Sequence, residues 1–295
     1  MSTEAINPRY VDLDSWDTLT ALRAFHEDQA AAVAAVAAAL PAIARAVDDA
    51  APRLRSGGRL VYVGAGTSAR IGVQDGAELF PTFNWPKEQV AFAIAGGERA
   101  LLQAIENAED SAADGAKRIE ELGVGPNDVV IGLAASGNTP FAVGAVKAAK
   151  QRGAMTVGIA SNPGSQLLTE SDHPILIETG AEPIAGSTRL KAGTAQKVVL
   201  NLFSTMVMVR LGRVYRGLMV HMRPTNEKLR RRAAQMVVTL TGCAPDVATA
   251  AVAKSDGDVK LAVLLARDVA MDAAQALLKK HDGNLRLALA EIGQP

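Results

Sequence analysis

Residues 61–78 read VYVGAGTSARIGVQDGAE, and they join an apolar run, a glycine turn and a helix-like pattern. The apolar run stops at Gly64-Ala65-Gly66, after which Thr67 and Ser68 open the helical pattern. A buried strand that ends in glycine directly before a helix is typical of ligand-binding turns in α/β proteins. An acid, Glu78, closes the segment, and its place there needs an explanation.

Short runs rich in Val and Ile alternate with helical patterns through the middle of the chain. This alternation predicts an α/β fold in which a parallel sheet is covered by helices on both faces, a three-layer αβα arrangement. Ligands of such sheets bind beyond the carboxyl ends of the strands, so the loops after Val63, Ala95, Leu133 and Ile159 are expected to form the functional edge. The predicted strands begin at Arg59, Val90, Asp128, Met155 and His173, and the predicted helices cover 68–80, a pair within 99–122, 140–153 and 191–211.

The two ends of the chain show helical patterns without strands. Residues 14–49 have helical spacing, and Pro41 marks a new helix start or a kink. Near the other end, KSDGDVKLAVL from Lys254 resembles KHDGNLRLALA from Lys280, which predicts two units of helix, Asp-Gly turn and helix. Arg230-Arg231-Arg232 is expected to be a solvated helix face. We expect a helical segment packed on the core over residues 1–56, the sheet-containing α/β domain over 57–223 and a helical (UBA-like) domain over 224–295.

Composition excludes several classes of protein. The 295 residues carry 31 Lys and Arg against 31 Asp and Glu, which argues against a nucleic-acid or anionic-membrane surface as the main partner. The single cysteine, Cys243, excludes a disulfide framework and a multi-thiolate metal site. No apolar run reaches the roughly 18–20 residues that a membrane span needs, and the opening MSTEAINPRYVDLD lacks the pattern of a secretion signal. We therefore expect a cytoplasmic protein.

Two loops of the predicted functional edge share one design. Each follows a strand, contains glycine and hydroxyl side chains, and opens a helix, so that backbone amides and hydroxyls can donate to an anion. Either loop alone is explained by helix capping, but two in one sheet favour a phosphorylated small molecule. A dinucleotide is disfavoured because Ala69 stands where GxGxxG needs glycine, and a Walker lysine is absent. The candidate binding residues are Gly66, Thr67, Ser68, Ser136, Gly137, Asn138 and Thr139.

A third anion-binding candidate precedes the predicted helix at 191–211. The stretch GSTRLKAGTAQK places Ser187, Thr188 and Lys191 at that helix start, and Lys191 could pair with a substrate carboxylate or phosphate. Capping together with a solvated charge is the equally weighted alternative.

These motifs, taken at their full length, resemble a known family. The strand–GTS–helix and strand–SGxTP–helix pair resembles the sugar isomerase (SIS) domain, which binds phosphosugars. Over essentially the whole chain the sequence is similar to one branch, the N-acetylmuramic acid 6-phosphate etherases. The stretches that carry the resemblance are YVGAGTSARIGVQDGAE, PTF, IAGGERALLQAIENAEDS, AASGNTPFAVGA, AGSTRLKAGTAQKVVLN, TEAINP and RLGRVYRGLMV.

The resemblance implies an activity and two acids. Enzymes of this family remove the D-lactyl ether from C3 of the phosphosugar, giving N-acetylglucosamine 6-phosphate and D-lactate, and this chemistry needs neither metal nor redox cofactor. By resemblance, Glu78 protonates the departing lactate and Glu109 is the second acid/base group, acting at C2. An acid that works at neutral pH needs a raised pKa, which partial burial of Glu78 among Ile71, Leu79 and Phe80 could supply. A surface position for Glu78 and a helix-start role for Glu109 are the plain alternatives.

The sequence departs from the family pattern at two positions. The family usually has glycine at the place of Ala69 and arginine at the place of Asn138. An arginine would supply a charge and a bidentate donor to phosphate, so Asn138 predicts weaker phosphate binding or an altered substrate, for which Arg189 could compensate.

Spacing along the first loop predicts a shared active site. Ser68 and Glu78 lie ten residues apart, which is about 15 Å along one continuous helix and is barely spanned by a hexose phosphate. We therefore expect a homodimer whose substrate lies between two subunits. The alternatives to an etherase are a non-catalytic phosphosugar regulator, which needs neither acid, and a phosphosugar isomerase or deaminase, which needs no acid at C3.

Overall fold

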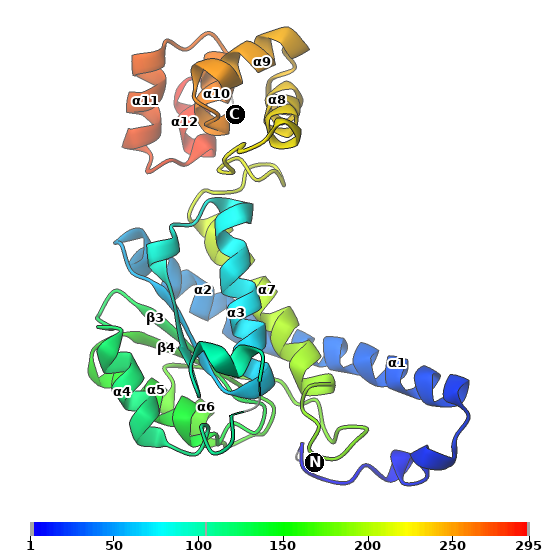
Figure 1. The fold of residues 1–295 in the computed structure, drawn as a ribbon. Coiled ribbons are helices and arrows are strands. Elements are labelled where there is room, and N and C mark those ends of the chain that lie inside the picture. Colours follow the sequence, from blue (N-terminus) through cyan, green and yellow to red (C-terminus); the bar gives the residue numbers. More distant parts are fainter. Residues whose placement is uncertain (1–2, 104, 294–295) are drawn as a thin grey trace. The chain divides into compact units, whose positions relative to one another are not determined.

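The computed structural model describes residues 3–103 and 105–293. The chain forms two compact units (Figure 1), of which the first comprises Met1–Ala77 and Lys87–Thr205 and the second comprises Glu78–Pro86 and Met206–Pro295. Helix α3 (Gly66–Phe83) begins in the first unit and ends in the second. The expected domain ranges 1–56, 57–223 and 224–295 divide the chain differently and stay a prediction.

The first unit contains the predicted parallel sheet. All pairings are parallel, and the strand order is β2-β1-β3-β4-β5. Every residue of β1, β3 and β4 is buried, as expected for Val- and Ile-rich strands covered on both faces. The strands are β1 Leu60–Gly64, β2 Val90–Ile94, β3 Val129–Leu133, β4 Met155–Ala160 and β5 His173–Leu176, so each of the five predicted strands is confirmed.

Helices cover both faces of this sheet (Figure 1). On one face Val61 and Val63 pack in a core with α4, α5 and α6, and on the other face α2, α3 and α7 lie against the sheet. The helices wholly within this unit are α1 Thr18–Ala35, α2 Leu40–Arg55, α4 Ala112–Glu121, α5 Pro140–Gln151 and α6 Gln166–Glu170, whereas α3 Gly66–Phe83 and α7 Lys191–Arg210 begin in it and end in the second unit. Its short 3-10 turns are η1 Pro8–Tyr10, η2 Leu13–Ser15, η3 Val36–Ala39, η4 Lys87–Gln89 and η5 Glu98–Leu101.

Two glycines let α3 lie very close to the sheet. A Cβ on Gly76 would stand 2.8 Å from the Phe92 ring, and one on Gly72 would stand 2.9 Å from Leu133. Between them Asp75 is buried, and its carboxylate accepts hydrogen bonds from β1 and α7. The glycine spacing thus fixes the helix that follows the first loop directly on the sheet.

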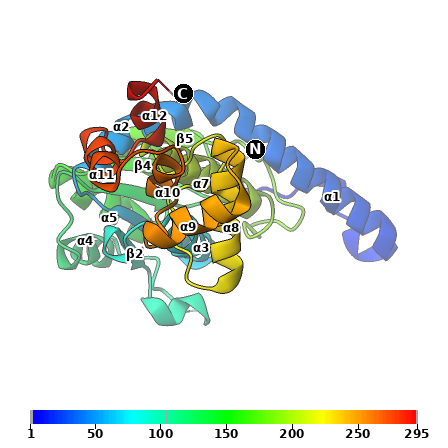
Figure 2. The ribbon, with the colours of Figure 1, turned by 90° about the horizontal axis from the view of Figure 1, so that it is seen from above.

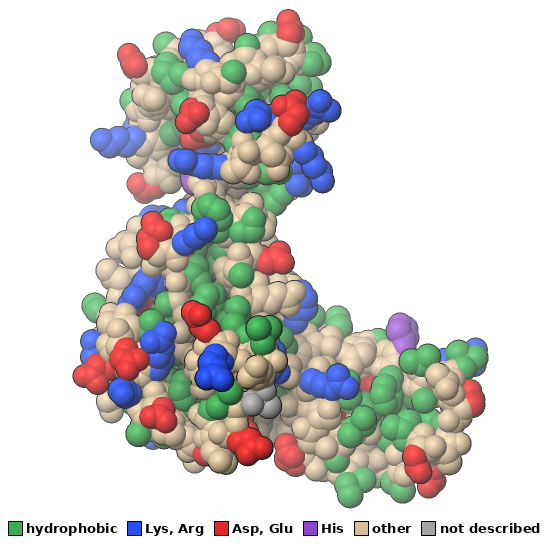
Figure 3. All heavy atoms as spheres, viewed as in Figure 1, with side chains coloured by type: hydrophobic (Ala, Val, Ile, Leu, Met, Phe, Trp, Pro, Cys, Tyr) green, Lys and Arg blue, Asp and Glu red, His purple; other side chains and the backbone are tan. Residues whose placement is uncertain are grey.

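The N-terminal helices largely match the sequence pattern. Pro41 stands in the first turn of α2, as predicted, and the 3-10 turn η3 separates α2 from α1. Figures 1 and 2 show α1 extending past the edge of the sheet. Its exposed side chains include Leu19, Leu22 and Val33, and Figure 3 shows apolar side chains gathered over this part of the first unit. A helical surface of this kind is typically covered in an assembly.

One helical stretch of the described residues is long and apolar enough to cross a membrane. It is Thr18–Arg55, with a mean hydropathy of 1.9 over an 18-residue window of which 33% is buried. Helices Glu227–Thr241 and Pro245–Lys254 meet the same length and hydropathy criterion only when they are counted as one span, although they are bent by 117° relative to each other. The expectation that no segment reaches span length therefore holds only for uninterrupted apolar runs, and core helices of soluble proteins meet this criterion too.

The region 99–122 differs from the prediction of two helices. Its first part is the short turn η5 followed by irregular chain, and only its second part is helical, as α4. Asn107 has a φ of +58°, in the left-handed region that interrupts a helix. Ser111 caps the start of α4, because its hydroxyl accepts a hydrogen bond from the Asp114 amide.

The second unit contains the predicted helical repeats (Figure 2). Both Asp-Gly turns adopt left-handed conformations, at Asp256-Gly257 and Asp282-Gly283, and Asp258 and Asn284 then cap the helices that follow. Arg230-Arg231-Arg232 is exposed, as expected. The helices are α8 Glu227–Thr241, α9 Pro245–Lys254, α10 Val259–Leu265, α11 Met271–Lys280 and α12 Leu285–Glu291.

Candidate functional site

The carboxyl ends of the central strands stop level with one another. Gly64 of β1 is paired in register with Ile94 of β2 and with Leu133 of β3. The loops that follow these strands therefore begin side by side at one edge of the sheet. The two predicted loops, 64–68 and 135–139, follow the neighbouring strands β1 and β3.

The first loop turns directly into α3. Gly66, the first residue of the helix, is exposed and has a φ of +52°, which a side chain would strain. Thr67 is half-buried, and no hydrogen bond of its hydroxyl is found among the described residues. Ser68 is buried, and its hydroxyl donates to Gln196 Oε1 of α7 at 2.9 Å. Of the two hydroxyls in this loop, the one without a partner among the described residues is thus that of Thr67.

The second loop is held closely against the loop after β4. Gly137 has a φ of +73°, and a Cβ there would stand 2.0 Å from Ser165 Oγ. Asn138 is exposed, and its Oδ1 accepts the Gln166 amide at 3.0 Å at the start of α6. Thr139 is the N-cap of α5, but its hydroxyl makes no capping hydrogen bond. The Ser136 hydroxyl is half-buried and accepts the Asn138 backbone amide at 3.2 Å, so this hydroxyl, the Asn138 side-chain amide and the Thr139 hydroxyl can all still donate to a ligand.

The third predicted segment already holds an anion of the chain's own. Glu182 is fully buried, and its carboxylate accepts the backbone amides of Lys191 and Ala192, each at 2.9 Å. Burial raises the pKa of Glu182, and these two amides partly offset that shift. The carboxylate thereby caps the start of α7. The sequence alone predicts that an anionic ligand binds at this helix start.

Lys191 is engaged within the first unit. Its side chain is buried, and its Nζ donates to the Ala181 carbonyl at 3.1 Å and lies 3.8 Å from Asp28 Oδ2. Ser187 and Thr188 are half-buried, and their hydroxyls show no hydrogen bond among the described residues. Because Lys191 already has partners within the chain, the two hydroxyls are the predicted groups of this segment that remain to bind an anion.

Close packing brings the predicted segments together. A Cβ on Gly193 would lie 3.3 Å from the Thr188 carbonyl oxygen and 3.5 Å from Thr67 Cγ2, so the first loop contacts the start of α7. The second loop is linked to the segment before α7 in two steps: Asn162 Nδ2 donates to the Ser136 carbonyl and to Thr3 Oγ1, and the Thr3 carbonyl accepts the Gly186 amide, each at 3.2 Å. The candidate phosphate-binding residues hence occupy one continuous edge.

Glu109 lies beside the second loop. Its backbone carbonyl accepts the Phe141 amide at 3.0 Å in the first turn of α5, directly after Thr139. The approach depends on Gly144, where a Cβ would stand 2.1 Å from the Ala112 carbonyl oxygen of α4. The Glu109 side chain is exposed, so it is available to a ligand at this edge.

Glu78 lies on α3 with an exposed side chain. The expected partial burial of this acid is wrong for the single chain, because Phe80 is 43% exposed and Ile71 is only half-buried. Leu79 points inward, and the neighbouring position on a helix is turned by about 100° from it. Any burial of Glu78 must therefore come from something that covers the single chain.

Sequence reasoning missed the acid that is buried in this helix. Asp75 Oδ2 accepts from the Tyr62 hydroxyl at 2.8 Å, and its Oδ1 accepts from Asn201 Nδ2 at 2.9 Å and Ser204 Oγ at 3.1 Å. Burial raises the pKa of Asp75 in spite of these hydrogen bonds. The flanking glycines Gly72 and Gly76 are the signal that could have located it, because they mark the face of α3 nearest the sheet.

Further polar groups near this edge were also missed. Gln196 Nε2 is buried without a hydrogen-bond partner, and so are the hydroxyls of Ser161, Ser165 and Thr179. They follow β4 and β5 or lie on α7, at long sequence distances from the loops they adjoin. Over the described ranges 3–103 and 105–293, no group of three or more His, Cys, Asp and Glu side chains gathers in a way that could hold a metal ion.

The chain is similar to known proteins over most of its length. A family model described as the glucokinase regulatory protein N-terminal SIS domain matches residues 42–150. A relative from Deinococcus radiodurans is 50% identical, with 90% of this chain and 87% of the relative covered, and one from Rubrobacter xylanophilus is 48% identical, with 89% and 87% covered. Both are named N-acetylmuramic acid 6-phosphate etherase.

A solved structure shares the fold. The phosphoheptose isomerase of Francisella tularensis has a TM-score of 0.50 and 20% sequence identity, and the match covers 66% of this chain and 100% of that chain. At this identity the likeness speaks for the architecture of the sheet and its helices alone.

Proposed function

The chain belongs to the N-acetylmuramic acid 6-phosphate etherase family, and from this premise we propose that it is a carbon–oxygen lyase that releases D-lactate from N-acetylmuramic acid 6-phosphate. The observation that carries the proposal is the match of about nine-tenths of the chain, at 50% and 48% identity, to relatives of that name. The second product is N-acetylglucosamine 6-phosphate, which places the reaction in the breakdown of cell-wall amino sugars.

The phosphate is proposed to bind at the edge formed by the first two loops and the start of α7. Four half-buried hydroxyls there have no partner among the described residues, and a phosphate group offers several strong acceptors to such donors. Asn138 provides an amide in place of the family's usual arginine. The proposed donors are Thr67, Thr139, Ser187 and Thr188, with the backbone of Gly66 and Gly137 and the side chain of Asn138.

The chemistry requires one base and one acid. In the open-chain sugar the aldehyde at C1 acidifies the C2 proton, and a base removes it. The C3–O bond of the ether then breaks, an acid protonates the lactate oxygen, and water adds across the new C2–C3 double bond, with hydroxyl to C3 and proton to C2. Each proton transfer of this kind is worth roughly 10²- to 10⁴-fold in rate.

Glu109 is proposed as the group acting at C2 and Glu78 as the acid at the lactate oxygen. Support for Glu109 comes from its exposed side chain beside the second loop. Support for Glu78 comes from its exposed position on the helix that starts at the first loop.

A homodimer with a shared site is part of the proposal. Helix α3 is continuous from Gly66 to Phe83, which meets the premise of the 15 Å separation between Ser68 and Glu78, about ten residues at 1.5 Å each. The exposed apolar side chains of α1 and the exposure of Phe80 leave surface for a second subunit. Mixing an inactive Glu109→Gln variant with an inactive Glu78→Gln variant is expected to restore activity, since one site of a mixed dimer then has both acids if they come from different subunits. A fully active monomer would contradict the shared site.

The direct test is release of D-lactate from N-acetylmuramic acid 6-phosphate. The native chain is expected to release lactate, and Glu78→Gln is expected to lower kcat by roughly 10²-fold or more. The matched control is Glu88→Gln, because Glu88 is an exposed acid in the nearby turn η4. If Glu78→Gln still exchanges the C2 proton but releases no lactate, Glu78 acts at the lactate oxygen and another group acts at C2. Binding without lactate release by the native chain would favour a phosphosugar regulator instead.

A cytoplasmic location completes the proposal. It is supported by the single free cysteine, Cys243, because proteins of oxidising compartments commonly carry disulfides. The balanced charge of the chain fits a small-molecule substrate rather than a nucleic acid.

A further inference from the structure

Thr3, close to the amino end of the chain, is held by several hydrogen bonds. Thr3 is fully buried, although the first residues of most domains are poorly ordered unless something holds them. Its amide donates to Asn162 Oδ1 at 3.2 Å, its hydroxyl oxygen accepts from Asn162 Nδ2 at 3.2 Å, and its carbonyl accepts the Gly186 amide at 3.2 Å. Residues 3–5 are called the N-terminal strap below.

Asn162 connects this strap to the second loop. Its Nδ2 donates both to Thr3 Oγ1 and to the Ser136 carbonyl, each at 3.2 Å. One side chain from the loop after β4 thereby bridges the N-terminal strap and the backbone of the second loop. Both hydrogen-bonding atoms of the amide are used, so a shift of either neighbour would break the arrangement.

The N-terminal strap also reaches the segment that leads into α7. In addition to the bond from the Gly186 amide, Glu4 Oε2 lies 2.9 Å from where a Cβ of Gly186 would stand. Gly186 directly precedes the half-buried hydroxyls of Ser187 and Thr188.

We propose that the N-terminal strap positions the phosphosugar site, with Thr3 and Asn162 as positioning residues that fix the second loop and the Ser187–Thr188 segment in one arrangement. This inference rests on the proposed function. Its physical basis is that the strap contacts loops that carry candidate phosphate donors, rather than the strands or the helix cores. Donors that are held in place before binding lose less freedom when the ligand arrives.

The binding of ligand and the ordering of the strap should be coupled. A short terminal segment held by few hydrogen bonds gains little beyond the entropy lost on ordering it. A ligand that orders the same loops therefore favours the ordered strap, and the ordered strap raises affinity by the same factor. Couplings of this kind typically change affinity by roughly 5- to 150-fold.

The test uses the full chain and four variants. A variant lacking residues 2–5 is expected to raise KM for lactate release about tenfold while kcat stays within about twofold. Thr3→Val, which removes the hydroxyl acceptor but keeps the shape, should raise KM less, and Thr3→Ser should restore the native value. The control is Ile6→Ala, since Ile6 is 73% exposed in the same segment and should change nothing.

A second readout keeps the proposal separate from the proposed function. Affinity for N-acetylglucosamine 6-phosphate, measured by calorimetry, should fall with the same ranking of variants even if lactate release is never observed. Unchanged KM and unchanged affinity in both the truncated chain and Thr3→Val would overturn the strap's role. A fall in kcat and in melting temperature without a change in KM or affinity would also overturn it, because that pattern marks a purely structural contact.

Discussion

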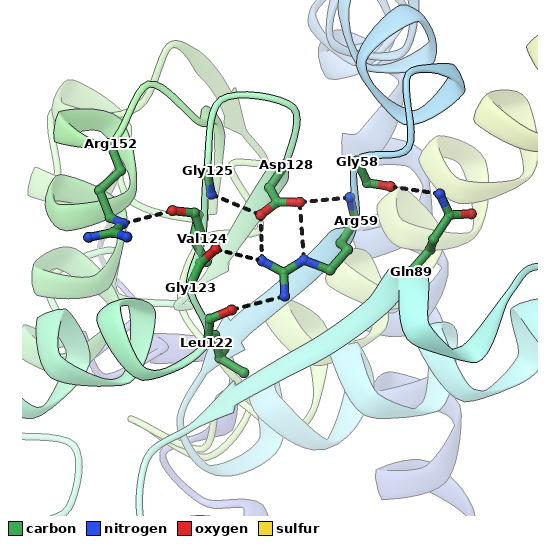
Figure 4. A network of polar contacts seen from close by, with 9 residues as sticks. All are labelled: Gly58, Arg59, Gln89, Leu122, Gly123, Val124, Gly125, Asp128 and Arg152. Carbon is green, nitrogen blue, oxygen red and sulfur yellow. Dashed lines mark hydrogen bonds and ion pairs between the residues drawn. The ribbon is translucent and has the colours of Figure 1, made fainter.

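The two ends of the central strands use polar residues in opposite ways. At the amino ends, polar groups bind one another: Arg59 and Asp128, which precede β1 and β3, form an ion pair at 2.6 Å (Figure 4). At the carboxyl ends, half-buried hydroxyls such as those of Thr67 and Thr139 have no partner among the described residues. Polar groups paired within the chain stabilise the fold, whereas partly exposed donors without partners are available to a ligand.

In the network at the amino ends, the charged groups are satisfied by hydrogen bonds within the chain (Figure 4). Arg59 donates from Nη1 to the Leu122 carbonyl at 2.9 Å and from Nη2 to the Gly123 carbonyl at 3.1 Å. Asp128 in turn accepts the Arg59 amide at 2.8 Å and the Gly125 amide at 3.0 Å. The network therefore ties the turn before β3 to the start of β1 and leaves little for a ligand to bind.

The largest effect on stability is expected from breaking this network. Asp128→Ala leaves the Arg59 guanidinium and two amides without their acceptor in a half-buried site, which should lower the free energy of unfolding by about 3 kcal/mol. Urea unfolding measures the loss, and the exposed Asp14→Asn serves as control. A KM unchanged in the folded fraction would agree with a structural role, whereas a stability equal to that of the native chain would break the comparison.

A smaller effect, divided between stability and binding, is expected at Gly137. In Gly137→Ala the new Cβ would collide with Ser165 Oγ, so the second loop must shift, and KM should rise about tenfold with a stability loss of about 2 kcal/mol. The matched control is Gly164→Ala, which has a similar φ of +69° but open space around the Cβ. If both variants behave alike, backbone strain explains the result and the contact with Ser165 does not.

The smallest effects concern pH and two carboxylates of the first unit. Burial raises the pKa of Asp75 despite its hydrogen bonds, so the folded state holds the proton more tightly, and stability falls as the pH rises through that raised pKa. Asp75→Asn should remove this decline, as urea unfolding at a series of pH values would show. A decline that persists in the variant would assign it to another group.

The pKa of Asp128 is shifted in the opposite direction to that of Asp75, so its effect on the pH dependence of stability is also opposite. Burial alone would raise its pKa, but hydrogen bonds from Arg59 and Gly125 outweigh burial and lower it. Its stabilisation is present above the ordinary aspartate pKa of about 4 and is lost as the pH falls through the lowered value. The native chain should accordingly lose stability in acid, and Asp128→Ala should lose less.

Much of the fold could be predicted because it depends on local patterns. Val- and Ile-rich runs located the strands, with β1 and β3 each beginning one residue after the predicted position. Glycines followed by hydroxyls located the loops at the carboxyl ends, because a tight turn needs left-handed backbone there. The Asp-Gly repeats predicted the helix pairs of the second unit for the same reason.

The features that the sequence did not predict depend on contacts between residues far apart in the chain. The cap that Glu182 forms on α7, the burial of Asp75 under α7 and the bond between Thr3 and Asn162 join positions that no local window compares. Helical spacing alone also gave Glu78 more burial than the single chain provides. Sequence patterns thus identified which loops matter, but not which of their side chains are already engaged within the chain.

The most direct test of the account is the affinity for N-acetylmuramic acid 6-phosphate of Thr139→Val, measured together with its free energy of unfolding. The Thr139 hydroxyl makes no capping hydrogen bond, so the account predicts stability within about 0.5 kcal/mol of the native value. Loss of a hydrogen bond to a charged phosphate predicts an affinity lower by about tenfold. Unchanged affinity, or a loss of stability like that of Asp128→Ala, would contradict the assignment of the carboxyl edge to the ligand.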